Sequence, residues 1–368
     1  MRSILTYPWL KKPDTTQAGE KHLVGWDVNT VPYAILTLAL STFLFSGCSL
    51  VKAPHVADKP VYRVWPEPPA PPRLAYVQSV YEPADLGVRW NGRQRFSRWL
   101  FGTEPGQGKL IKPFGVALDE TDNLCLTDTG SRVVCYFDRT RKTWQSWNKI
   151  GRIQLVSPVA VAKYQNRLFV ADSGLGKVLA FDPQGKFLFE LNHPLERPAG
   201  LVIANGKLYV ADAGAHQVLA FDLHGNFLSA MGTRGTGPGE LNYPTHLATD
   251  GQGRVLVTDS MNCRVQIFDT EGRYVQTIGS QGDSSGNLSR PKGVGVDSDR
   301  NVYVLDALFD NVQVFDQEGR FLLGVGGPGP GAGEFWMPAG LAIGRDNQIF
   351  VADTYNRRIQ IFKYLHQP

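Results

Sequence analysis

Beyond residue 110, one phrase recurs six times in this 368-residue chain, and it is clearest as LYVADAGAHQVLAFD from Leu208 to Asp222. Each copy holds an aspartate, a phenylalanine nine residues after it, and a proline fourteen or fifteen residues before it. The aspartates are Asp128, Asp172, Asp212, Asp259, Asp306 and Asp353. The phenylalanines are Phe137, Phe181, Phe221, Phe268, Phe315 and Phe362, and the prolines are Pro113, Pro158, Pro198, Pro244, Pro291 and Pro338. Because successive aspartates lie 40 to 47 residues apart, the chain is an array of similar units rather than a set of unrelated domains.

Each unit contains four short runs rich in Val, Ile, Leu, Phe and Tyr, separated by Gly, Asn and Asp, which is the composition of strands and turns. In the fifth unit the runs are GVGVD, VYVLD, VQVFD and FLLGV. Several runs are apolar on both faces, as expected where a small sheet is packed between two neighbours. Four strands in a repeat of this length are typical of a propeller blade. The sequence predicts an all-β fold in which residues 111–368 carry six repeats.

The order of proline, Gly-Val-Ala, Val-Ala-Asp, an aspartate-flanked turn and Val-Gln-Val-Phe-Asp resembles the NHL repeat, and it covers residues 112–364. Six copies imply, by this resemblance, a six-bladed β-propeller of four-stranded blades. The resemblance is specific for the fold and says little about function.

The last unit lacks its fourth strand. That strand begins with Phe187, Phe227, Tyr274 or Phe321 in four blades, whereas the sixth unit stops at IFKYLHQP. An unfinished blade would leave exposed strand edges. The run YVQSV at 76–80 closely matches YVQTI at 274–278, so residues 74–81 are predicted to complete the last blade and close the ring, with Tyr76 in the place of Tyr274.

Residues 82–110 form an insertion between this closing strand and the first repeat. Phe96, Trp99 and Leu100 lie three and four residues apart, which predicts a short amphipathic helix. The sequence allows two roles for this helix: it packs against the propeller, or it contacts lipid or a partner.

The N-terminal part reads as an export signal. Residues 31–47 carry no charge, follow Lys11, Lys12 and Lys21, and are shorter than a comfortable membrane span of about 20 residues. The motif FSGC that ends at Cys48 resembles the lipobox of bacterial lipoproteins. The resemblance implies that residues 1–47 are a signal peptide, that Cys48 is acylated and, with Ser49 next, that the protein resides in the outer membrane. An uncleaved anchor helix is the alternative, and the long leader suggests that translation starts after Met1.

Residues 48–73 contain seven prolines and cannot bury a core, so we predict a tether that separates a propeller of residues 74–368 from the lipid anchor. The formal net charge of +4 is too small to indicate a nucleic-acid partner.

Candidate functional residues come from positions that differ among the repeats. Four residues after the repeat aspartate stand Arg132, Gly176, His216, Cys263, Asp310 and Arg357. His216, Cys263 and Asp310 belong to three consecutive units, and His246 follows the fourth repeat proline. Together they predict a candidate site for zinc or another divalent metal, or a nucleophile with its base and orienting carboxylate. Solvated loop residues are the alternative.

The segment DAGAHQV around His216 also resembles the zinc-ligand segment of peptidylglycine amidating lyases. That resemblance implies a ligand role for His216 alone, because the residues directly after the repeat prolines, where those enzymes place further histidines, are not histidine here. The repeat aspartates are predicted to accept hydrogen bonds from backbone N–H groups at the turns.

Other residues indicate binding rather than catalysis. Arg132, Lys292 and Arg357 are candidate contacts for an anion or an acidic partner, and Trp336 and Tyr243 are candidate stacking residues for a polysaccharide. Cys125 and Cys135 flank one predicted hairpin, so an exported protein would hold them as a disulfide or as two buried thiols.

No complete catalytic set can be assembled from these residues. We therefore expect an exported, lipid-anchored module that binds a protein of the cell envelope or acts as a scaffold there, with no firmly assigned cofactor. A metal-assisted lyase or hydrolase in units three to five, and a sensory or polysaccharide-binding module, are the alternatives.

Overall fold

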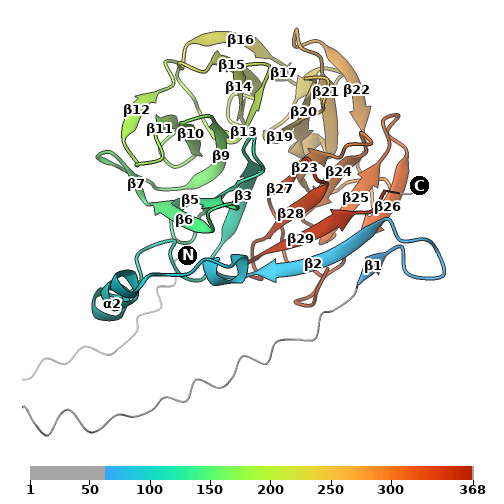
Figure 1. Cartoon of the computed structure of the whole chain (residues 1–368). Helices are drawn as coiled ribbons and strands as arrows, with labels where there is room; N and C mark the ends of the chain where they lie inside the picture. The colour runs from blue at the N-terminus through green and yellow to red at the C-terminus, as the bar shows by residue number, and fades with distance from the viewer. Residues whose placement is uncertain (1–62, 367–368) are drawn as a thin grey trace, which may run out of the picture. The chain divides into compact units, whose positions relative to one another are not determined.

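The computed structural model describes residues 63–366, and these form a six-bladed β-propeller of four-stranded antiparallel blades (Figure 1). Within that range no helix has the length and apolar character needed to cross a bilayer. The expected all-β fold and its six blades are confirmed.

Each blade runs from an innermost to an outermost strand. Blade 1 is β3 (Pro113–Leu118), β4 (Leu124–Asp128), β5 (Val133–Asp138) and β6 (Thr143–Trp147). Blade 2 is β9 (Pro158–Tyr164), β10 (Arg167–Asp172), β11 (Lys177–Phe181) and β12 (Phe187–Glu190). Blade 3 is β13 (Pro198–Ala204), β14 (Lys207–Asp212), β15 (Gln217–Asp222) and β16 (Phe227–Met231). In these three blades the repeat proline opens the innermost strand and the repeat aspartate ends the second.

The remaining blades follow the same order. Blade 4 is β19 (Pro244–Thr249), β20 (Val255–Asp259), β21 (Arg264–Phe268) and β22 (Tyr274–Ile278). Blade 5 is β23 (Pro291–Val296), β24 (Val302–Asp306), β25 (Asn311–Phe315) and β26 (Phe321–Val325). Blade 6 is β27 (Leu341–Ile343), β28 (Gln348–Asp353) and β29 (Arg358–Tyr364), to which the N-terminal β2 (Leu74–Val80) and β1 (Val64–Trp65) are added.

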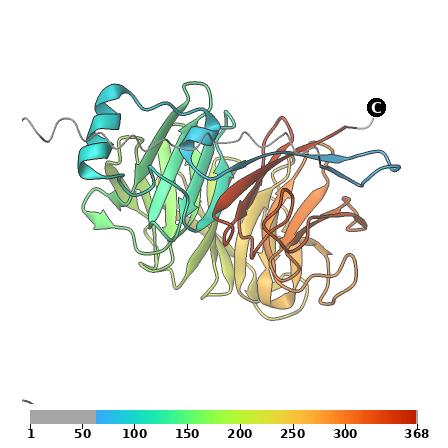
Figure 2. The ribbon, with the colours of Figure 1, turned by 90° about the horizontal axis from the view of Figure 1, so that it is seen from below.

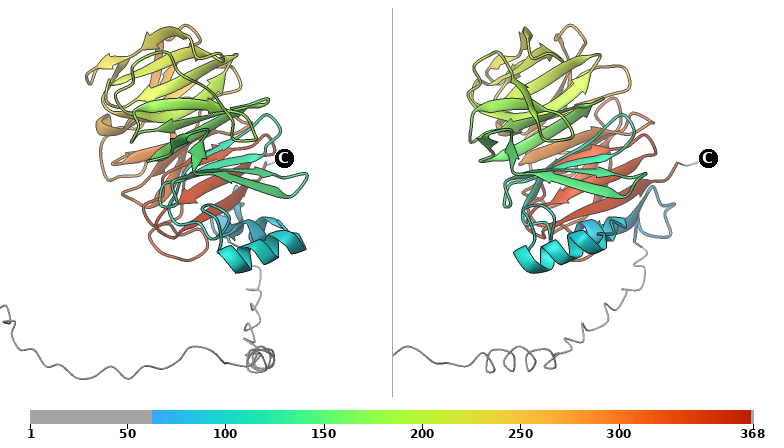
Figure 3. Two further views of the ribbon diagram at one scale, coloured as in Figure 1. Left: turned by 90° about the vertical axis from the view of Figure 1, so that its left-hand side faces the viewer. Right: turned by 60° about the vertical axis from the view of Figure 1, so that its left-hand side comes forward.

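Short elements connect the blades. They are the strand pairs β7 (Lys149–Ile150) with β8 (Ile153–Gln154) and β17 (Thr233–Arg234) with β18 (Glu240–Leu241), the 3-10 turns η1 (Pro83–Leu86) and η2 (Ser260–Asn262), and the helix α2 (Gly92–Phe101). The helix predicted in the insertion is therefore present, and it stands at the edge of the ring (Figure 3).

The ring is closed by β2, as predicted. Strand β2 pairs antiparallel with β29, and Tyr76 lies opposite Phe362 just as Tyr274 lies opposite Phe268 in blade 4. Figure 2 shows β2 running along the C-terminal strands at the edge of the disc. Both ends of the array are thus held in one sheet.

The predicted tether is wrong at its C-terminal end. Strand β1 pairs with β2 as a fifth strand of blade 6, and the buried ring of Trp65 packs edge-on against Phe362 with 5.7 Å between centroids. An apolar pair inside the proline-rich segment is enough to join the sheet, so residues 63–73 belong to the propeller. The rest of the predicted tether, Cys48 and the predicted signal peptide lie outside the described residues.

The core is divided into six clusters, and each cluster fills the space between two adjacent blades. Phe181, Phe221, Phe268 and Phe315 are all fully buried near the ends of the third strands. Burying one such ring contributes roughly 1.5–3 kcal/mol. The invariant spacing between aspartate and phenylalanine therefore repeats one packing contact around the ring.

The innermost strands approach each other closely. A Cβ atom added to Gly200 would lie 2.3 Å from the carbonyl oxygen of Thr245, and one added to Gly340 would lie 2.3 Å from that of Phe114. Only glycine avoids these clashes, which explains why glycine stands two residues after the repeat proline in four of the six blades.

Candidate functional site

The propeller has two unlike faces. One, here called the loop face, consists of the two residues before each repeat proline and the four residues after each repeat aspartate. The opposite one, here called the turn face, consists of the turns that join first to second strands and third to fourth strands. Because the strands are antiparallel, these two sets of connections lie at opposite ends of every blade.

The repeat aspartates shape the loop face. The carboxylate of Asp212 accepts hydrogen bonds from the backbone N–H groups of Glu196 (2.8 Å) and Arg197 (2.7 Å), which precede the repeat proline of the same blade. Asp172 accepts equivalent bonds from Val156 and Ser157 at 2.7 and 2.9 Å. These buried carboxylates therefore fix the loops that enter each blade, and the bonds agree with the predicted structural role.

The residues four positions after the aspartates have a structural role that the sequence did not reveal. All six have a positive φ, between 49° for Asp310 and 64° for Gly176. Three of them bond to the next blade. His216 Nδ1 accepts from the Tyr243 N–H (3.1 Å), Cys263 Sγ donates to the Ser289 carbonyl (3.1 Å), and Asp310 accepts from the Met337 N–H (2.6 Å).

The predicted metal or catalytic group is consequently not assembled. His216, Cys263 and Asp310 each face a separate blade junction, and no three His, Cys, Asp or Glu side chains between residues 63 and 366 are arranged to hold a metal ion. Burial raises the pKa of the Cys263 thiol, and the carboxylates of Asp306 and Asp259 raise it further. A neutral thiol is a poor nucleophile and a poor ligand.

His246 lies apart from those residues, in the central channel. Its ring centroid is 6.1 Å from that of Phe114, which comes from the opposite blade, and the Lys292 Nζ atom lies 5.9 Å from the Phe114 centroid. These side chains meet across the channel at its loop-face end. Burial, and then the charge of Lys292, lower the pKa of His246 to about 3. Its buried Nε2 has no hydrogen-bond partner among the residues that the structure describes.

The loop face also carries cations, some of them beside this end of the channel. The sequence predicted Arg132, Lys292 and Arg357 as contacts for an anion or an acidic partner. The structure adds three cations on the same face that sequence reasoning missed, Lys112, Arg197 and Arg290. None of the six forms an ion pair with another described residue, since the ion pairs of the described chain involve other cations. Burial, followed by the charges of Arg290 and Arg197, lowers the pKa of Lys292. The loop face is thus electropositive at its centre.

Exposed apolar side chains share the loop face with these cations. They are Ile111, Val156, Met261, Leu308, Trp336 and Tyr355. Trp336 and Tyr355 lie 5.6 Å apart between ring centroids, with Lys112 5.4 Å from the Tyr355 centroid. Tyr243, the other predicted stacking residue, is partly buried and has the Arg197 guanidinium 5.6 Å from its ring centroid. The aromatic contact on this face is therefore the pair Trp336 and Tyr355.

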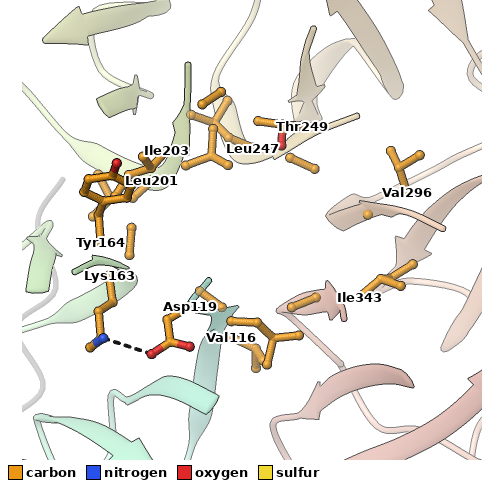
Figure 4. Close-up of a pocket in the computed structure, with 18 of the residues that line it drawn as sticks. Val116, Asp119, Lys163, Tyr164, Leu201, Ile203, Leu247, Thr249, Val296 and Ile343 are labelled. Carbon is orange, nitrogen blue, oxygen red and sulfur yellow. Dashed lines mark hydrogen bonds and ion pairs between the residues drawn. The ribbon is translucent and has the colours of Figure 1, made fainter. Parts of the chain in front are cut away.

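A well of about 390 Å³ occupies the turn-face end of the channel. Figure 4 shows that aliphatic side chains such as Leu201, Leu247 and Ile343 surround it, with Lys163 directed at Asp119. The Lys163 Nζ atom lies 2.9 Å from the Asp119 carboxylate, and both side chains are almost wholly buried. The well was not predicted, because its walls are the ordinary aliphatic ends of the innermost strands.

Cys125 and Cys135 are two free buried thiols, so the disulfide alternative is wrong. In the hairpin of blade 1, Cys125 lies opposite Tyr136 and Cys135 lies opposite Leu126. The one-residue offset directs the two sulfurs to opposite sides of the sheet, because side chains alternate along a strand. Cys125 packs between blades 1 and 2, and Cys135 packs between blades 6 and 1.

A family profile described as 6-bladed beta-propeller matches residues 192–254, 247–308 and 288–365. No curated protein matches the sequence significantly. Among solved structures, an auxiliary nutrient binding protein from Bacteroides thetaiotaomicron is similar, with a TM-score of 0.56 and 15% identity over 70% of this chain and 71% of that one.

A streptogramin B lyase is also similar, with a TM-score of 0.53 and 11% identity over 70% of this chain and 94% of its own. A selenomethionine-substituted virginiamycin B lyase from Staphylococcus aureus has a TM-score of 0.52 and 11% identity, and 69% of this chain and 96% of the lyase are covered. At these identities the likeness concerns the fold alone. The chain is similar to proteins of the six-bladed β-propeller kind, and it shares that architecture.

Proposed function

We propose that this protein is an exported, lipid-anchored propeller with NHL-type repeats that binds an acidic protein partner in the bacterial cell envelope through its loop face. The observation that carries the proposal is the combination, on one face, of six cations that form no ion pair with another described residue and a set of exposed apolar side chains. Aromatic residues and arginine are enriched at protein interfaces, and complementary charge accelerates association.

The partner is expected to present carboxylates next to an apolar segment. Trp336 and Tyr355 supply a large apolar contact beside Lys112, while Lys292 and Arg290 supply positive charge near the axis. The apolar pair would lose its water on binding, and the cations would gain counterions that residues 63–366 do not provide.

The other functions that the sequence left open have less support. The metal-assisted lyase or hydrolase would need His216, His246, Cys263 and Asp310 in one place, whereas three of them bond across different blade junctions. The similar lyase structures share only the fold. A polysaccharide-binding module would use Trp336 and Tyr243, and the Tyr243 ring already has a guanidinium beside it.

Site-specific photo-crosslinking in intact envelopes tests the proposal. A photoreactive residue in place of Met261 or Leu308 is expected to give one crosslinked protein, through a segment rich in Asp and Glu. The yield should fall as salt is raised, because salt screens exposed charges. Matched controls carry the same residue in place of Glu271 or Glu318, which are exposed on the turn face.

Equal crosslinking from both faces would overturn the assignment to the loop face. Attachment to a segment without acidic residues, or a yield that does not depend on salt, would overturn the acidic partner.

A further inference from the structure

Helix α2 turns its apolar side chains to solvent. Phe96, Trp99 and Leu100 lie on one side of the helix, because residues three and four apart are neighbours on a helix surface. They are exposed by 61%, 78% and 53%, and the rings of Phe96 and Trp99 contact each other at 5.9 Å between centroids. An exposed apolar face of this kind marks a surface that contacts a membrane or another protein.

The charge of the helix indicates which apolar phase this is. Its sequence, GRQRFSRWLF, holds three arginines and no acidic residue. Arg93 and Arg95 are exposed, and at 100° per residue they lie on either side of the apolar face. An apolar face of Phe, Trp and Leu flanked by arginines is typical of helices that lie in the interface of an anionic membrane.

The position of the helix in the chain agrees with a nearby membrane. The helix follows β2 by eleven residues, and β2 with β1 forms the outer edge of blade 6, where the described chain begins at Arg63. Figure 1 shows α2 and β1 along the same edge of the disc. Fifteen residues lead from Cys48 to Arg63, which span at most about 45 Å when extended as polyproline II.

We propose that α2 lies in the surface of an anionic phospholipid bilayer and, together with the lipid on Cys48, holds the propeller against the membrane by its edge. The inference rests on the lipid anchor of the proposed function. In this orientation neither the loop face nor the turn face is pressed against lipid, so the loop face stays open to a partner.

Quenching of tryptophan emission by brominated lipid tests the helix directly. The full lipidated protein is reconstituted into vesicles of phosphatidylethanolamine and phosphatidylglycerol at 3:1, with and without bromine on the acyl chains. The emission of Trp99 is the difference between the wild type and Trp99→Phe. Most of this emission should be lost with the brominated anionic vesicles. A smaller loss is expected in vesicles of brominated phosphatidylcholine alone, which carry no net negative charge.

Trp336 provides the matched control, because it is also exposed but lies on the loop face. Its emission, obtained in the same way from Trp336→Phe, should be unaffected by bromine.

Unquenched Trp99 on a protein whose Cys48 carries acyl chains by mass spectrometry would overturn the helix proposal and leave the anchor intact. A Cys48 without acyl chains would overturn the anchor and the edge-on arrangement together. A change in Trp99 that follows protein concentration rather than lipid would assign the helix to a second copy instead.

Discussion

The two faces of the propeller differ in how many of their exposed cations have an ion-pair partner among the described residues. On the turn face, Arg273 and Arg320 reach back four residues to Asp269 and Asp316, at 2.7 and 2.6 Å. On the loop face the repeat aspartates are buried and accept backbone N–H groups, and Asp259 and Asp353 also pair with arginines of their own blades. The six loop-face cations named above form no ion pair with a described residue. Charge on the turn face is therefore balanced within the turns that hold these pairs, whereas the loop face keeps cations that a partner can bind.

The largest expected effect is the difference in stability between two single variants, each lacking one aspartate of a different face. Asp353 is fully buried, forms an ion pair of 2.8 Å with the buried Arg358, and accepts the N–H of Trp336. Asp353→Ala leaves a buried guanidinium without its counterion, which should lower the free energy of unfolding by about 3–5 kcal/mol. Asp316→Ala breaks a pair with an exposed arginine and two hydrogen bonds from N–H groups of its turn, so it should lower the free energy of unfolding by less than Asp353→Ala does.

Chemical denaturation of the two variants measures the difference. Equal losses of stability would show that the loop-face aspartates do not hold the structure in the way their hydrogen bonds indicate.

The sequence predicted the architecture well because the repeat exposes it. Spacing alone gave the six blades, and the likeness of residues 76–80 to 274–278 gave the closing strand in its correct register. Strand β1 was missed because its two apolar residues lie between prolines. A pair of that size carries no periodic signal.

The candidate site was harder to predict. His216, Cys263 and Asp310 have the chemistry of ligands, and a sequence does not reveal that each bonds to the next blade. The left-handed backbone at these positions gives one hint, since Gly176 occupies the equivalent place in blade 2. Whether an arginine has an ion-pair partner depends on which carboxylates lie near it in the folded chain, so Arg197 and Arg290 were missed. The well was missed because aliphatic strand ends look alike whether they line a cavity or a core.

A second prediction concerns pH and the loop-face end of the channel. The unfolded chain binds a proton on His246 below about pH 6.5, whereas burial and then Lys292 lower the pKa of His246 in the native protein to about 3. Between these values the unfolded state holds the extra proton, so the free energy of unfolding decreases as the pH falls. At pH 5 the loss relative to neutral pH is about 2 kcal/mol.

Denaturation of the wild type and of His246→Gln at pH 7.5 and pH 5.0 isolates this contribution. The variant should lose less stability between the two pH values. An identical loss in both proteins would mean that His246 is protonated without penalty in the native channel.

The smallest expected effect compares the charges of the two faces directly. The triple variant Arg132→Ser, Arg290→Ser, Arg357→Ser removes three cations from the loop face. The matched triple variant Arg254→Ser, Arg273→Ser, Arg320→Ser removes three that already pair with aspartates on the turn face. Both variants lower the net charge by the same amount, so net charge cannot distinguish them. An exposed charge contact contributes roughly 0.2–1 kcal/mol, and the loop-face triple should bind a polyanion such as heparin about tenfold more weakly.

Salt-gradient elution from a heparin column provides the measurement. The loop-face variant should elute well before the wild type and the turn-face variant close to it, because paired arginines offer little charge to a distant anion. Equal shifts for both triples would mean that the polyanion responds only to the total charge. The difference between paired and unpaired cations would then have no consequence for binding. The charge of the loop face would no longer support an acidic partner for that face.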